Sequence, residues 1–223
     1  MSSYLREVLL EIYRGLYYHF GPQHWWPAES PFEVCVGAIL TQNTNWRNVE
    51  RAIENLKTRG FLSPEALHRL SVEELAGLIR PAGYFRIKAQ RLKAFVDFLV
   101  SRYEGELSAL AEKETDEIRK ELLSIKGIGP ETADSILLYA LERPVFVVDA
   151  YTKRILLRHG LTTEEAGYDE LQELFMKSLP RDTQLYNEYH ALLVACGKHY
   201  CLSRKPRCSS SEKNSCPLVR VMT

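Results

Sequence analysis

A single acidic residue, Asp149, stands between an apolar run and a predicted helix. Residues 145–148 read V-F-V-V, and the helix expected after Asp149 spans about 150–158. Aspartate is a preferred N-cap, so its carboxylate could accept hydrogen bonds from the first helical turn. A carboxylate beside apolar residues can also stabilise a developing positive charge or orient a water molecule. Taken alone, these residues favour the cap, and a catalytic role needs support from the rest of the chain.

The residues before Asp149 include K-G-I-G-P at 126–130, between two predicted helices. Glycine tolerates positive φ, and proline suits the first turn of a helix, so the pattern predicts a tight helical hairpin. The backbone N–H groups of such a hairpin suit a phosphate oxygen, which fixes position on a nucleic acid without reading its sequence. The residues expected to face the DNA backbone are Lys126, Gly127, Ile128, Gly129 and Thr132.

Helical patterns run through the whole sequence. They predict helices at 4–19, 31–40, about 46–58, 87–103, about 150–158, 167–178 and 183–195, and a helix that starts near 115 and enters the hairpin. Ser71 with Glu74 and Thr162 with Glu165 have the spacing of a capping box. The only strand-like segment is 145–148, so the fold class is all-α.

Composition limits what the protein can be. Lys+Arg and Asp+Glu are both 29, so a nucleic-acid contact must rest on local basic patches such as 153–158 and 204–207. No apolar run is long enough for a membrane span, and the charged N-terminus does not resemble a signal peptide. Cys35 stands alone, whereas the other four cysteines lie between 196 and 216. This usage favours a cytoplasmic protein that binds metal over a disulfide framework.

Taken together, the hairpin and the following V-V-D-x-x-T-x-R resemble the helix-hairpin-helix, Gly/Pro-rich loop and Asp signature of the endonuclease III superfamily of DNA glycosylases. The resemblance covers nearly the whole chain. It implies a six-helix domain at 30–135, a second helical domain from 1–29 and 136–195 that carries Asp149, and a Cys-rich loop at 196–223. It also implies a DNA cleft between the domains, with Asp149 as both cap and catalytic residue. The expected partner is double-stranded DNA with a damaged base, bound by a monomer away from membranes.

The resemblance places a DNA wedge in T-Q-N-T at 41–44. An enzyme that flips a nucleotide out of the stack needs a group for the vacated space, and Gln42 or Asn43 would supply it. The alternative is a polar loop that only satisfies two helix ends.

The three tryptophans indicate a base pocket. W-W-P at 25–27 and an aromatic residue after T-Q-N-T resemble the 3-methyladenine glycosylase subgroup of the MagIII type, in which these residues line the pocket. Trp25, Trp26, Pro27 and Trp46 are the matching residues, and Trp46 stands where that subgroup has Phe. Indole faces stabilise a stacked cation, which suits an N-alkylated purine. The alternative is ordinary core packing.

One position separates the subgroups. Bifunctional endonuclease III carries a nucleophilic lysine just after the hairpin, where this chain has Glu131. A carboxylate cannot form a Schiff base, so a monofunctional enzyme without AP lyase activity is expected. The rival hypotheses are an endonuclease III for oxidised pyrimidines, a mismatch glycosylase for thymine or adenine, and a non-catalytic DNA-binding module.

The cysteine tail partly matches the [4Fe–4S] loop of the family, C-x6-C-x2-C-x5-C. Cys201 and Cys208 match its first half, and Cys216 resembles a third ligand displaced by an insertion. Met222 stands where the fourth ligand would be, and Cys196 could replace it because a cluster needs four ligands. The alternative is a decayed loop without a cluster.

Overall fold

The computed structural model describes residues 3–208 and 216–220, and within these ranges the protein is all-helical, with no strand. The chain divides into two compact units, which we call the central unit (residues 26–143) and the terminal unit (residues 1–25 and 144–223). The central unit thus extends past residue 135, where the sequence places the boundary. No helix in the described part of the chain is long and apolar enough to cross a membrane.

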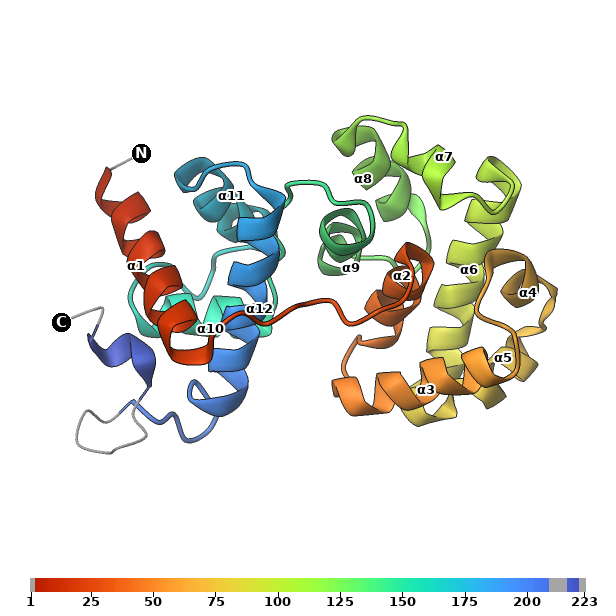
Figure 1. The fold of residues 1–223 in the computed structure, drawn as a ribbon, viewed down its shortest axis with the longest axis horizontal. Coiled ribbons are helices and arrows are strands. Elements are labelled where there is room, and N and C mark those ends of the chain that lie inside the picture. Colours follow the sequence, from red (N-terminus) through yellow and green to blue (C-terminus); the bar gives the residue numbers. More distant parts are fainter. Residues whose placement is uncertain (1–2, 209–215, 221–223) are drawn as a thin grey trace. The chain divides into compact units, whose positions relative to one another are not determined.

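The central unit contains eight α-helices and two short turns among its residues. They are α2 (Pro31–Leu40), α3 (Trp46–Thr58), α4 (Pro64–Arg69), α5 (Val72–Leu78), η1 (Arg80–Ala82), α6 (Phe85–Tyr103), α7 (Leu107–Ala111), α8 (Thr115–Ser124), α9 (Pro130–Ser135) and the π-helical turn η2 (Ile136–Ala140). The terminal unit contains α1 (Ser3–Phe20), α10 (Ala150–Arg158), α11 (Tyr168–Ser178), α12 (Thr183–His199) and the 3-10 turn η3 (Pro217–Arg220). Figure 1 labels the α-helices.

The core of the central unit forms around α2, α6 and the π-turn η2. Every residue of α2 after Pro31 is buried, and α2 contacts α3, α6, α9 and η2 (Figure 1). Glu33 is the one charged residue of α2, and its carboxylate pairs with Lys57 Nζ at 2.9 Å. The other residues are apolar on all sides of the helix, so the helix must be enclosed. Gly37 lies in the middle of α2, and a Cβ there would sit 3.0 Å from the indole of Trp26. Glycine at this position therefore makes room for Trp26 against the helix.

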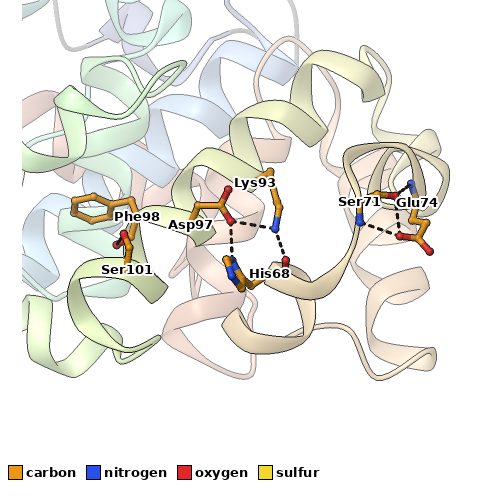
Figure 2. Close-up of polar contacts among 7 residues, drawn as sticks. All are labelled: His68, Ser71, Glu74, Lys93, Asp97, Phe98 and Ser101. Atoms are coloured by element: carbon orange, nitrogen blue, oxygen red, sulfur yellow. Dashed lines mark hydrogen bonds and ion pairs between the residues drawn. The ribbon is translucent and has the colours of Figure 1, made fainter.

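Polar contacts fix α4 against α6 and cap the start of α5. Figure 2 shows the Asp97 carboxylate of α6 accepting from His68 Nδ1 of α4 at 2.8 Å and pairing with Lys93 Nζ at 3.0 Å. Ser71 and Glu74 in the same view form the predicted capping box at the start of α5, with both reciprocal hydrogen bonds present. These contacts stabilise the packing of α4 on α6 and the N-terminus of α5.

The terminal unit is organised by α12, which packs on α10 and α1 (Figure 1). A Cβ on Gly197 would sit 2.3 Å from the ring of Tyr151, so the glycine permits close approach of α12 to α10. Phe146 stacks on Phe175 of α11, with the ring centroids 3.9 Å apart. Gln172 Nε2 donates to the backbone oxygen of Phe146. This packing holds the segment 145–148, which has no regular secondary structure and precedes Asp149.

Several expected helices are confirmed, and three local expectations need correction. α6 begins at Phe85 and α12 continues to His199, so both are longer than expected. The capping box expected at Thr162–Glu165 is wrong, because α11 begins only at Tyr168, after Gly167. The carbonyls of Glu164 and Ala166 instead accept from Lys153 Nζ, which holds this segment as a turn.

Candidate active site

Asp149 lies at the N-terminus of α10, where the sequence places it. Its Oδ1 accepts from the backbone N–H of Thr152 at 2.7 Å and from the Thr152 hydroxyl at 2.9 Å. Its Oδ2 lies 3.7 Å from Nε2 of His190, a buried residue of α12. The cap uses one carboxylate oxygen, and the other faces His190.

The surroundings keep this carboxyl group ionised. Burial alone would raise the pKa of Asp149, but His190 and the hydrogen bonds from Thr152 outweigh it and lower the pKa below its ordinary value. The side chain remains 12% exposed, so the carboxylate is largely desolvated. A fixed, ionised and poorly solvated carboxylate is the arrangement that stabilises a developing cation best.

Lys198, two turns beyond His190 on α12, is a second charge near Asp149. Burial lowers the pKa of Lys198, and the negative charge of Asp149 acts against this shift. The Lys198 ammonium also lies 5.6 Å from the ring centre of Trp25. The structure thus places Trp25 in the terminal unit, with a cation already over its ring.

In the central unit, the residues between α8 and α9 form the predicted hairpin. Ile128 N–H donates to the Ile125 carbonyl at 3.0 Å, and Gly127 adopts φ +91°. Only this glycine needs positive φ, because Gly129 is extended and lies at the N-cap of α9. Ile128 is buried, so its side chain anchors the hairpin in the core. Lys126 is exposed, so its side chain faces solvent.

A buried ion pair joins the two helices of the hairpin. Arg119 of α8 donates from Nε to Asp134 Oδ1 at 2.7 Å and from Nη2 to Oδ2 at 3.1 Å. Asp134 is fully buried, so this paired geometry compensates the cost of its desolvation. The two helices are therefore fixed in their relative orientation.

The loop between α2 and α3 contacts the hairpin. Gln42 Nε2 donates to Thr132 Oγ1 at 2.9 Å and to the Gly127 carbonyl at 3.3 Å. Asn43 is exposed, with φ +53°. The two wedge candidates of the sequence therefore lie in different environments.

Two of the three tryptophans meet. Trp26 lies edge-on to Trp46, with ring centroids 5.1 Å apart, and its ring centroid is 5.3 Å from that of Tyr139 in η2. Both tryptophans are partly exposed, Tyr139 is buried, and Pro27 is exposed. The result is an aromatic group that we call the Trp26–Trp46–Tyr139 cluster.

Residues 36–181 match the family described as "HhH-GPD superfamily base excision DNA repair protein". The chain belongs to the HhH-GPD superfamily.

The HhH-GPD relatives cover most of the chain. It is 50% identical to the "Putative DNA repair glycosylase MJ1434" of Methanocaldococcus jannaschii, across 95% of this chain and 94% of that protein. It is 30% identical to endonuclease III of Thermotoga maritima, across 85% and 84% of the two chains. The crystal structure of H. pylori 3-methyladenine DNA glycosylase (MagIII) bound to 1,N6-ethenoadenine superposes with a TM-score of 0.74 at 30% identity, covering 89% of this chain and 98% of that one.

Within the HhH-GPD fold, Glu131 occupies the second position of α9 and is exposed. Pro130 precedes it at the first helical position, as the sequence predicts. The Glu131 side chain therefore stands at the hairpin and not in the core.

The four cysteines gather near η3 and the end of α12. Cys196, Cys201 and Cys216 are buried, Cys208 is exposed, and all four are free thiols. Cys196 Sγ lies 4.0 Å from Cys216 Sγ, and this contact lowers the pKa of Cys216 to about 7. Thiols are the usual ligands of iron–sulfur clusters, and Cys196 and Cys216 are the pair that the structure brings into contact.

The thiols do not form a complete ligand shell by themselves. Within residues 3–208 and 216–220, no group of three or more His, Cys, Asp or Glu side chains has the geometry of a metal site. Arg158 donates to the Cys201 sulfur at 3.1 Å, and Cys208 alone is exposed. Met222 and the insertion at 209–215 lie outside the described residues.

The sequence patterns do not single out three residues that lie near these sites. They are Lys88, Arg91 and His190. Lys88 and His190 fall on the apolar faces of their helices, and a charged or ionisable residue on such a face is the signal that could have revealed them. Arg91 carries no such signal, since a partly exposed arginine on a helix is ordinary.

Proposed function

We propose that this HhH-GPD protein is a monofunctional DNA glycosylase that hydrolyses the N-glycosidic bond of alkylated purines such as 3-methyladenine. The observation that carries the proposal is the Trp26–Trp46–Tyr139 cluster. Electron-rich rings attract a cation, and a purine alkylated at a ring nitrogen carries positive charge. Two tryptophans with a tyrosine suit such a base better than they suit a neutral pyrimidine.

The similarity to MagIII supports the same substrate class, since that protein is a 3-methyladenine DNA glycosylase, solved bound to 1,N6-ethenoadenine. Trp25 and Pro27 remain part of the proposed pocket. The main stacking role is assigned to Trp26 and Trp46, because the ring of Trp25 already faces the Lys198 ammonium.

The proposed chemistry needs no strong general acid. As the bond between the sugar C1′ and the base nitrogen lengthens, its electron pair moves to the cationic base, which leaves neutral. Positive charge builds on the sugar, and Asp149 Oδ2 stabilises it. Water then attacks C1′ and gives its proton to Asp149 or to solvent, which leaves an abasic site.

The second half of the proposal is the absence of lyase activity. Lyase chemistry requires an amine that forms a Schiff base with the sugar, and Glu131 cannot supply one. Water is then the nucleophile, and the DNA strand stays intact. The partner is double-stranded DNA containing the damaged base, held at the hairpin through Lys126, Gly127, Ile128, Gly129 and Thr132.

We also propose that Cys196, Cys201, Cys208 and Cys216 hold a [4Fe–4S] cluster. The support is the 4.0 Å contact between Cys196 Sγ and Cys216 Sγ, which joins the two ends of a 21-residue segment, and the burial of Cys201 between them in sequence. When bound, such a cluster would order the basic segment 204–207. No step of base excision depends on it.

The substrate proposal is tested with a panel of duplexes. They carry 3-methyladenine, an oxidised pyrimidine, a G·T mismatch or no damage, and each is treated with alkali after incubation to cut abasic sites. We expect cleavage of the alkylated duplex only. Preferential cleavage of the oxidised pyrimidine or of the mismatch would favour the endonuclease III or thymine glycosylase alternative, and binding without any cleavage would favour a non-catalytic module.

A further inference from the structure

The segment 26–29 runs back along one face of α2 before the helix begins. The backbone N–H of Glu29 donates to Glu33 Oε2 at 3.0 Å, and the ring of Trp26 lies against Gly37. Positions 33 and 37 are four residues apart, so they lie on the same face of the helix. This face of α2 therefore contacts both ends of the segment that carries Trp26.

Gly37 determines how closely Trp26 approaches α2. A Cβ at position 37 would lie 3.0 Å from Cζ2, 3.2 Å from Nε1 and 3.3 Å from Cε2 of the indole. These distances are shorter than ordinary van der Waals contacts, so a methyl group there would displace the ring by a few tenths of an ångström. Glycine weakens the interior of a helix relative to alanine, and this close approach explains why the buried helix contains one.

The ring that rests on Gly37 also belongs to the Trp26–Trp46–Tyr139 cluster. Its centroid lies 5.1 Å from that of Trp46, the first residue of α3, and 5.3 Å from that of Tyr139 in η2. The Trp26 ring is thus bounded by α2, α3 and η2. A shift of this ring away from α2 therefore alters its spacing from the other two rings.

Glu33 fixes the other end of the segment. Its side chain is 7% exposed, its Oε2 accepts from the Glu29 N–H, and its Oε1 pairs with Lys57 Nζ at 2.9 Å. Lys57 lies in the last turn of α3, the helix that begins with Trp46. One buried carboxylate therefore joins the segment before α2 to both α2 and α3.

A helix cap is the simpler explanation of Glu33. Ser30 Oγ accepts from the Glu33 N–H at 3.2 Å, and a glutamate at this position often bonds back to the backbone at the helix N-terminus. Capping does not require burial, however, since Glu74 completes the capping box of α5 while exposed. A buried carboxylate is costly unless it is paired, and both oxygens of Glu33 have partners. Its burial therefore serves the junction with Lys57 and Glu29 as well as the cap.

We propose that Glu33 and Gly37 are positioning residues that set the depth of Trp26 against α2 and thereby the width of the base pocket. The inference rests on the proposed glycosylase function and adds what limits the size of the alkylated base. Both residues act through Trp26 and not by contact with the base.

The test uses DNA treated with a methylating or an ethylating agent, and measures the release of 3-methyladenine and of 3-ethyladenine under single-turnover conditions. Both bases are cationic and they differ by one methylene group, so the ratio of the two rates reports the room in the pocket. We expect Gly37→Ala to shift this ratio about tenfold against the ethylated base, a typical effect of one methylene in an apolar pocket. Glu33→Gln should shift the ratio in the same direction.

Near-ultraviolet circular dichroism follows the indole rings without any substrate. The chain has three tryptophans, and two of them, Trp26 and Trp46, lie edge-on to each other. We expect Gly37→Ala and Glu33→Gln both to change the tryptophan bands, because each alters the position of Trp26.

Gly77→Ala and Glu29→Gln are the matched controls. Gly77 lies inside α5, and a Cβ there would meet nothing within 4 Å. The Glu29 side chain is 82% exposed and pairs with the same Lys57, but the backbone N–H that Glu33 holds is unchanged by the substitution. Both controls should keep the wild-type ratio and the wild-type tryptophan bands.

The double variant Gly37→Ala/Trp26→Phe separates positioning from a general loss of stability. Phenylalanine lacks the indole nitrogen and Cζ2 that a methyl group at position 37 would meet. In the Trp26→Phe background, Gly37→Ala should therefore cause no further change in the ratio. If Gly37→Ala alone does not fold, the double variant should fold, and a double variant that also fails to fold contradicts the proposal.

The remaining outcomes decide between this inference and the proposed function. Equal loss of both rates in Gly37→Ala and Glu33→Gln, or unchanged tryptophan bands, would overturn the inference alone, provided that the wild type releases 3-methyladenine. A wild-type protein that releases neither base would contradict the inference together with the proposed function.

Discussion

His190 Nε2 lies 3.7 Å from Asp149 Oδ2, on the carboxylate oxygen that the helix cap does not use. The cap and the proposed chemistry therefore occupy different atoms of one side chain. Thr152 orients the carboxylate through Oδ1, and His190, on the side of Oδ2, lowers the pKa of the carboxyl group. This division explains how one aspartate can satisfy a helix N-terminus and still act on a substrate.

The first prediction concerns pH. Burial raises the pKa of Asp149, but His190 and the Thr152 hydrogen bonds together lower it by more, so the net shift is downward. His190 makes the largest of the lowering contributions. Activity that needs the ionised carboxylate should be retained to unusually low pH and lost as pH falls through the folded-state pKa. The associated folding stability is present above the unfolded-state pKa and is lost over the same fall.

His190→Gln should raise the Asp149 pKa and move the acid limb of the single-turnover pH–rate profile to higher pH. His68→Gln, on the surface of the central unit beside Asp97, is the control and should not move it. An unchanged acid limb in His190→Gln would show that His190 only fills space.

The second prediction concerns the pocket. Trp26→Ala should weaken excision of 3-methyladenine by roughly 1–3 kcal/mol, the usual contribution of one base–aromatic stack. Trp26→Phe should retain more activity, because it keeps an aromatic face. Thermal unfolding of both variants separates stacking from stability. Full activity in Trp26→Ala and in Trp46→Ala would remove both residues from the pocket.

The third prediction concerns iron. Protein purified without oxygen should contain iron and absorb around 400 nm, as is typical of this cofactor class. Cys216→Ser should lose both signals, whereas Cys35→Ser, which changes the isolated buried thiol of α2, should keep them. Iron-free wild-type protein would mean that the four thiols have only a structural role.

The fourth prediction concerns the nucleophile. Borohydride reduces a Schiff base to a stable adduct, so it traps lyase enzymes on DNA. Because Glu131 replaces the lyase lysine, no adduct should form during excision by the wild type. A robust adduct would show that another lysine attacks the sugar.

Local patterns allowed much of the fold to be predicted. The helix N-terminus at Asp149, the Ser71 capping box and the hairpin all depend on residues within a few positions of one another. The pairing of His190 with Asp149 and of Arg91 with Gln42 joins residues far apart in the chain. Sequence periodicity shows which face of a helix is buried, but not which distant side chain it meets.

The central claim is that Asp149 drives hydrolysis of an alkylated base without strand cleavage. The most direct measurement compares wild type with Asp149→Asn on a duplex containing 3-methyladenine, under single-turnover conditions, with and without alkali. Asparagine is also a good N-cap, so the variant should fold and bind DNA. We predict alkali-dependent cleavage by the wild type, with a rate lower by orders of magnitude in Asp149→Asn. Comparable rates in the two proteins, or strand breaks before alkali, would contradict the account.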